Sequence, residues 1–72
     1  MSRYLGGLPN GKIVAIEIKA SSTVTARDAR HLVWLRERLG DQFQSGVVFH
    51  TGPFSVELSD RIRSLPISAL WS

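Results

Sequence analysis

The sequence predicts an α/β fold: a small mixed β-sheet with one main helix in a strand–helix–strand unit. Two segments rich in β-branched and aromatic residues, 12–19 and 46–51, flank a stretch at about 26–39 that has helical periodicity. A helix of that length between two strands favours parallel pairing, because the chain must return to the same end of the sheet. With 72 residues and no cysteine, we expect a single small domain, 1–72, without disulfides.

A turn precedes the first of these strands. Pro9-Asn10-Gly11 has turn chemistry, because proline presets its own backbone and Asn-Gly tolerates positive φ. Within 12–19, alternation places Glu17 on the same face as Ala15, and apolar residues on both faces indicate that the Glu17 face is partly covered.

The residues before the turn have weaker strand character. Because Gly6-Gly7 interrupts any strand started by its neighbours, residues 1–8 are expected to form a loose segment and 9–72 the core. The strand 12–19 would then expose an edge that can pair with another chain.

The main helix has recognisable ends. Thr25 is expected to be the N-cap, with Asp28 three residues later, and Gly40 is expected to end the helix. Arg36 falls within the apolar stripe, so its stem should pack while its guanidinium extends outward. That stripe comprises Ala29, Leu32, Val33, Leu35 and Leu39.

Shorter elements follow the second strand. Alternation at 54–58 and the apolar spacing at 60–65 predict two short strands, and Pro66 opens a final turn. Trp71 is expected to close the core from the C-terminal side.

The composition is that of a globular protein with a mildly basic balance. Nine Lys and Arg against six Asp and Glu give a net charge of +3, which permits nucleic-acid contact without requiring it. No apolar run approaches the about 20 residues of a membrane span, and residues 1–7 lack the apolar core of a secretion signal. We therefore expect a cytoplasmic protein with no membrane partner.

Glu17-Ile18-Lys19 is the segment with the clearest chemical argument. Residues two apart on a strand point the same way, so a carboxylate and an ammonium would lie side by side. Glu17 can serve as a metal ligand for Mg²⁺, and Lys19 can stabilise a phosphoryl oxygen, which makes both candidate catalytic residues. The alternative is an exposed, solvated ion pair of little energetic consequence.

A second candidate site is the outer face of the helix. Its basic side chains surround a tryptophan, so they can contact phosphates while the indole stacks on a base. The same surface fits a protein partner, or a solvated face on which Arg38 or Arg30 covers the indole by a cation–π contact. The residues of this basic helix face are Arg27, Arg30, His31, Trp34 and Arg38.

The strand 14–22 resembles the signature strand of the restriction-endonuclease-like, or PD-(D/E)XK, superfamily. From about residue 8 to 71, the order and spacing are similar to the C-terminal domain of unknown function attached to prokaryotic AAA-type ATPases. The resemblance implies a truncated restriction-endonuclease-like core and a metal-dependent nuclease site at Glu17 and Lys19. The other matching segments are 28–32, 39–43, 46–52, 60–61 and 65–71.

Two departures from that family bear on activity. The hairpin strand of the family supplies an acidic residue, and carrying the register back places that position near Arg3, with no Asp or Glu before Glu17. The ATPase module is also missing, because no Gly-x-x-x-x-Gly-Lys-Ser/Thr motif is present to bind phosphates.

Three functions therefore remain open. The first is a non-catalytic remnant or interaction module that forms a homo-oligomer or binds a protein partner, with no cofactor. The second is a nuclease in which another subunit supplies the missing acid and Mg²⁺ is bound. The third is a nucleic-acid-binding module that uses the basic helix face.

Overall fold

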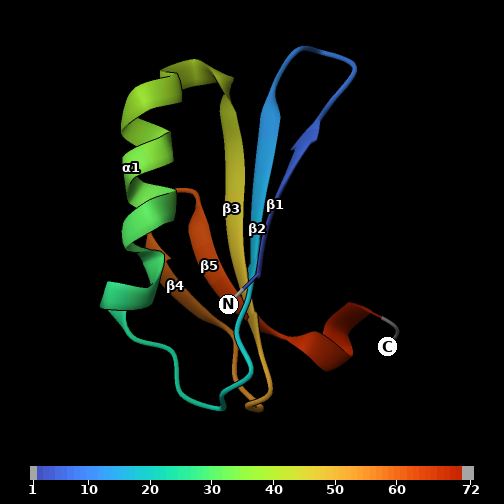
Figure 1. Cartoon of the computed structure of the whole chain (residues 1–72), viewed down its shortest axis with the longest axis vertical. Coiled ribbons are helices and arrows are strands. Elements are labelled where there is room, and N and C mark those ends of the chain that lie inside the picture. Colours follow the sequence, from blue (N-terminus) through green and yellow to red (C-terminus); the bar gives the residue numbers. More distant parts are fainter. Residues whose placement is uncertain (1, 71–72) are drawn as a thin grey trace.

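A computed structural model describes residues 2–70. Its five strands form one mixed sheet in the order β1-β2-β3-β5-β4, and helix α1 lies against one face of that sheet (Figure 1). This confirms the α/β class that the sequence predicts. The strands are β1 (Ser2–Gly7), β2 (Ile13–Ile18), β3 (Phe43–His50), β4 (Val56–Ser59) and β5 (Ile62–Pro66); α1 is Arg30–Leu39, and a final 3₁₀ turn is Ile67–Leu70.

The prediction of a loose segment at residues 1–8 is wrong, because β1 is a regular strand. It pairs antiparallel with β2, so that Arg3 lies opposite Glu17 and Gly6 opposite Val14. The two glycines are tolerated because each Cβ would face open space and the backbone is stabilised by pairing with β2. Consequently β2 is an interior strand, and the expected free edge of the sheet belongs to β1.

The β1–β2 turn has the predicted chemistry. Asn10 Oδ1 accepts a hydrogen bond from the amide of Lys12 at 3.0 Å, and the amide of Gly11 donates to the carbonyl of Leu8 at 2.9 Å. Gly11 has a φ of 83°, a left-handed conformation that glycine adopts without steric cost.

The strand–helix–strand unit is also confirmed. β2 and β3 are parallel, and β3 pairs in parallel with β5. Between β2 and β3, residues Ala26–Ala29 form a 3₁₀ turn that leads into α1, and Gly40 follows the helix with a φ of 56°. The predicted helix at 26–39 therefore has the right span, with a tighter first turn.

The main core lies between α1 and the sheet. Gly46 on β3 allows the helix to lie close to the sheet, because a Cβ there would lie 2.9 Å from Cζ of Phe43 and 3.2 Å from Cδ1 of Leu32. The guanidinium of Arg36, which lies in the apolar stripe of the helix, donates hydrogen bonds to Ser59 Oγ at 2.7 Å and to the carbonyl of Asp60 at 2.8 Å. The buried core residues are Ala15, Ala29, Leu32, Phe43, Val48 and Ile62.

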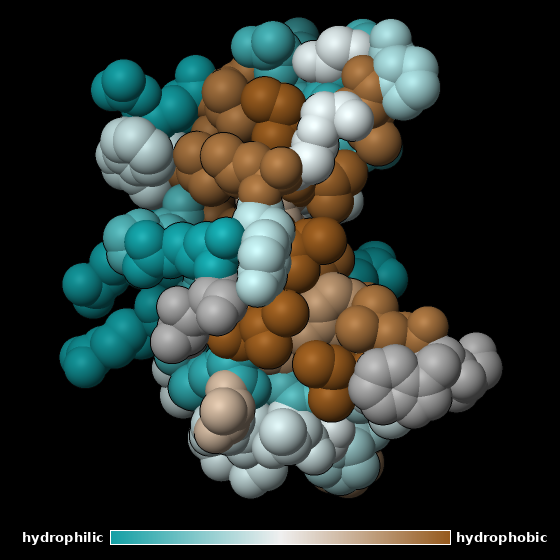
Figure 2. Space-filling view, turned by 45° about the vertical axis from the view of Figure 1, so that its right-hand side comes forward, coloured by the Kyte–Doolittle hydropathy of each residue, from teal (hydrophilic) through white to brown (hydrophobic). Residues whose placement is uncertain are grey.

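The opposite face of the sheet carries no helix among the described residues. Its side chains come from the alternate strand positions, and they gather in an apolar band along the molecule (Figure 2). We call this surface the open sheet face. Its apolar members are the exposed Tyr4 and the half-buried Val14, Ile16, Ile18, Val47 and Leu65. Phe49 is on the same side of the sheet but is already buried. Trp71, predicted to close the core, lies outside the described residues.

Candidate functional site

Glu17 lies on the β2 face that α1 covers, and its side chain is 1% exposed. The interpretation of Glu17 as one half of a solvated pair is therefore wrong, whereas the predicted coverage of its face is confirmed. Its nearest cation is Arg3, directly across on β1, with 3.3 Å between Arg3 Nε and Glu17 Oε1. Within residues 2–70, neither carboxylate oxygen of Glu17 has a hydrogen-bond partner.

Lys19 makes its contacts elsewhere. It lies just beyond the end of β2, and its Nζ donates to Asp28 Oδ2 at 2.6 Å and to the carbonyl of Thr23 at 2.9 Å. The charged partners of Glu17 and Lys19 are thus Arg3 and Asp28, and the expected carboxylate–ammonium pair is replaced by two separate ion pairs. Lys19 fastens the loop after β2 to the start of the helix.

Asp28 is the acceptor at the centre of this second ion pair. The hydrogen bond from Lys19, followed by one from the backbone amide of Thr25 at 2.8 Å, lowers the pKa of Asp28 below its ordinary value of 3.8. The hydroxyl of Thr25 adds a longer hydrogen bond of 3.3 Å. Thr25 and Asp28 therefore form the helix start that their spacing predicts.

The residues around Glu17 do not fit a resident Mg²⁺ ion. That ion needs several oxygen ligands and retains tightly bound water, whereas Glu17 offers one carboxylate with a guanidinium already beside it. In the described part of the chain, no three His, Cys, Asp or Glu side chains gather closely enough to hold a metal.

Four residues of the basic helix face, Arg30, His31, Trp34 and Arg38, lie together on α1, whereas Arg27 lies in the 3₁₀ turn before it. All five side chains of this face are exposed, and Arg30, His31 and Trp34 line a shallow hollow of about 350 Å³. Arg38 lies over the indole, with its guanidinium carbon 5.1 Å from the centre of the Trp34 ring. This is the cation–π contact of the solvated-face interpretation, and it leaves Trp34 56% exposed.

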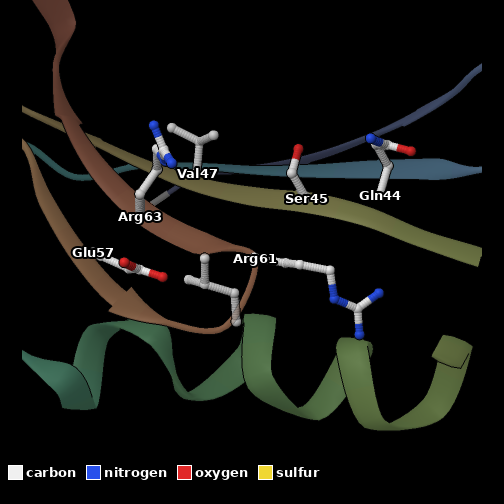
Figure 3. A pocket seen from close by; sticks show the side chains of 7 residues that line it. Gln44, Ser45, Val47, Glu57, Arg61 and Arg63 are labelled. Atoms are coloured by element: carbon white, nitrogen blue, oxygen red, sulfur yellow. The ribbon is translucent and has the colours of Figure 1, made fainter. Parts of the chain in front are cut away.

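Another hollow, of about 410 Å³, coincides with neither predicted site (Figure 3). Arg61 reaches from the β4–β5 turn toward the end of α1 and donates to the carbonyls of Phe43 and Gly40, at 2.6 and 3.1 Å. Arg63 points away from the helix and lies opposite Glu57 in the β4–β5 register. The remaining lining residues are Gln44, Ser45, Val47 and Ile62. Sequence reasoning did not single out Arg61, whose φ of 62° carries no sequence signal.

His50 is a second buried polar group, 4% exposed at the end of β3. Its Nδ1 accepts a hydrogen bond from the amide of Gly52 at 3.0 Å, which assigns the proton of the neutral ring to Nε2. In the described residues, Nε2 has no partner. Gly52 fits tightly here, because a Cβ would lie 2.4 Å from the carbonyl oxygen of Ser22.

These features define a small α/β domain whose mixed sheet is packed against a helix on one face, with a buried glutamate paired to a half-exposed arginine across its N-terminal hairpin. Residues 5–70 match the family described as Domain of unknown function (DUF4143), and the chain belongs to this family. Neither the curated proteins nor the solved structures contain a match. No helix in the described part of the chain is long and apolar enough to cross a membrane.

Proposed function

We propose that this protein is a non-catalytic interaction module that pairs with a second copy of itself through the open sheet face. The observation that carries the proposal is the apolar composition of that face. Ile16 and Val47, both half-buried, are neighbours in the β2–β3 register, and Tyr4, which is 56% exposed, lies opposite Ile16 on β1. Contiguous apolar surface of this kind is typical of interaction sites on small soluble domains.

The non-catalytic part of the proposal is supported by the environment of Glu17. The position where the resemblance implies a second acid is occupied by Arg3, whose guanidinium neutralises the carboxylate. A nuclease in which another subunit supplies an acid and Mg²⁺ is bound is less well supported. Such an acid would bring a second negative charge to a carboxylate that is 1% exposed and would have to remove the cation that balances it.

A second copy is the occupant best supported by the chain itself. The core of the described residues is small and has no disulfide to strengthen it, and oligomerisation is a common way for such a core to bury more apolar surface. The open sheet face also carries Arg63 and Glu57, charges of opposite sign, at its β4–β5 end. In a two-fold symmetric interface, each surface meets its own copy, so these charges can pair across it.

Sedimentation velocity over a range of protein concentrations tests the pairing. The double variant Ile16→Thr/Val47→Thr keeps β-branched side chains but removes apolar groups from both copies, each worth about 0.8 kcal/mol. We expect its dimer dissociation constant to rise more than about tenfold. Val56→Thr is the matched control, because Val56 lies opposite Ser64 on the other side of the sheet, and its dimer should be unchanged. A wild-type chain that remains monomeric at every concentration would contradict the proposal.

The basic helix face supports a second candidate function, nucleic-acid binding. The stacking of Arg38 on an exposed Trp34, with Arg30 beside the same hollow, favours it. Binding to a single-stranded oligonucleotide should weaken steeply with salt, and Arg38→Ala should lower both the affinity and the salt slope. Binding that is independent of salt would exclude this function.

We further propose that the domain is a restriction-endonuclease-like core of the kind attached to prokaryotic AAA-type ATPases, and that it works in the cytoplasm. The strand–helix–strand unit preceded by a hairpin supports the first part. The order of sequence motifs from residue 8 to 71 supports the relation to the domains attached to ATPases.

A further inference from the structure

We propose that a hollow bounded by β1, β2 and α1 is a binding site for an organic cation, an alkylammonium or guanidinium group on a short apolar stem. The hollow measures about 220 Å³. Glu17 contributes the anionic group, and Arg3 lies at the edge-strand side. The walls are mainly apolar and include Leu5, Ala15, Leu32 and Leu35.

The carboxylate of Glu17 is incompletely paired. It is 1% exposed, yet neither oxygen accepts a hydrogen bond from any described residue. A buried charge without hydrogen bonds carries a large desolvation cost that its own ion pair offsets only when the geometry is good. The 3.3 Å separation from Arg3 Nε is an ion pair without a hydrogen bond, so a better-placed donor would strengthen the site.

Arg3 can act as a removable cover over this carboxylate. Its side chain is 53% exposed and projects from β1, an edge strand of the sheet. Moving the guanidinium into solvent would leave Glu17 without a cation, so it happens only in exchange for a cation that takes its place, while water replaces the contacts of the guanidinium itself. A ligand cation that takes its place preserves the charge balance around Glu17.

The walls determine which cation fits. Leu5, Leu32 and Leu35 can contact an alkyl stem, whereas they offer no oxygen to replace the water of a hydrated metal ion. Since the chain has a net charge of +3, selectivity must come from short-range contact with Glu17 rather than from long-range attraction.

This inference goes beyond the proposed function and is independent of it. Glu17 lies on the sheet face that α1 covers, whereas the proposed pairing uses the open sheet face. Cation binding can therefore be tested on a monomer or a dimer.

The test is a titration of the ¹⁵N-labelled full chain with n-butylammonium chloride, followed by amide chemical shifts at constant ionic strength. Saturable shifts centred on Leu5, Ala15 and Leu35 are expected, with a contact between the butyl protons and the Leu35 methyl groups. N-acetyl-lysine methylamide forms a second arm that presents the same cation as a side chain. Binding in either arm supports the site, and the arm that binds shows whether the cation is a free amine or the side chain of a peptide. Absence of binding in both arms overturns the proposal.

Variants assign the effect to the two charged residues. Glu17→Gln should weaken binding about tenfold or more, because a charge-assisted contact is lost, whereas Glu57→Gln is the control and should leave it unchanged. Arg3→Gln should strengthen binding several-fold by removing the competing cation. If Glu17→Gln does not fold, the Arg3→Gln variant alone tests the proposal. Weaker binding in Arg3→Gln would contradict the role of Arg3 as a removable cover over Glu17. Shifts produced by MgCl₂ but not by butylammonium would also overturn the proposal.

Discussion

Asp28 shows how one carboxylate joins the end of a strand to the start of a helical region. It accepts hydrogen bonds from Lys19 at the end of β2 and from Thr25 at the start of the helical region. Both interactions favour the charged carboxylate, so the pKa of Asp28 is lower in the folded chain than in the unfolded chain. Its contribution to the free energy of unfolding is therefore complete above the ordinary pKa of about 3.8 and is lost as the pH falls through the lowered value.

The variant Asp28→Asn should change the pH dependence of the free energy of unfolding. The variant should lose about 1 kcal/mol of unfolding free energy at pH 7, because it weakens the cap and removes the ion pair. Its stability should also fall less steeply than that of wild type below about pH 4. Urea denaturation followed by circular dichroism from pH 7 to pH 2 measures both quantities. Asp60→Asn is the control, since Asp60 is 79% exposed and should change neither. Parallel pH curves for Asp28→Asn and wild type would contradict the assignment.

The partners of single charged residues were only partly predictable. The Thr25–Asp28 spacing predicts a helix start, because both groups lie within one turn. The pairing of Glu17 with Lys19 assumes that the strand continues through Lys19, whereas β2 ends at Ile18 and Lys19 turns toward Asp28. The Arg3–Glu17 pair needs the hairpin register, in which the two residues are equally far from Asn10.

At the scale of elements, the contact between α1 and β3 depends on the absence of one side chain. Gly46 lies beneath Leu32 and beside Phe43, both buried. Since neither side chain has free space to move into, the helix can keep its distance from the sheet only while this position lacks a Cβ.

Gly46→Ala should accordingly destabilise the protein by about 1–3 kcal/mol, the usual cost of an overpacked core. Gly6→Ala is the matched control, because a Cβ on β1 meets no atom within 4 Å and should be neutral or slightly stabilising. Thermal denaturation of the two variants under identical conditions measures the difference. Equal melting temperatures would show that the helix can shift to accommodate the methyl group.

The elements themselves were predicted with one exception, although β3 begins at Phe43 rather than at the predicted residue 46. Helical periodicity located the helix, and runs of β-branched residues located β2 and β3, because these patterns reflect burial directly. β1 was missed because Gly6 and Gly7 have low strand propensity. In an edge strand, however, backbone pairing with β2 is sufficient to hold such residues.

For the whole molecule, the sequence predicts the α/β class and the parallel pairing of β2 with β3, because a helix must connect them. The position of β5 between β3 and β4 depends on contacts among distant segments, which local patterns do not specify. The basic helix face was found because its residues belong to one helix. The cation hollow was not, since its walls come from β1, β2 and α1 together.

Because Arg3 lies on the edge strand β1, the exposure of Glu17 to water depends on local opening of that strand. A strand bonded to a neighbour on one side only frays at a lower free energy than interior strands do. Each fraying of β1 would uncover the carboxylate and admit water to it. A ligand that contacts both β1 and α1 would suppress this fraying, so binding at Glu17 would also stabilise the edge strand.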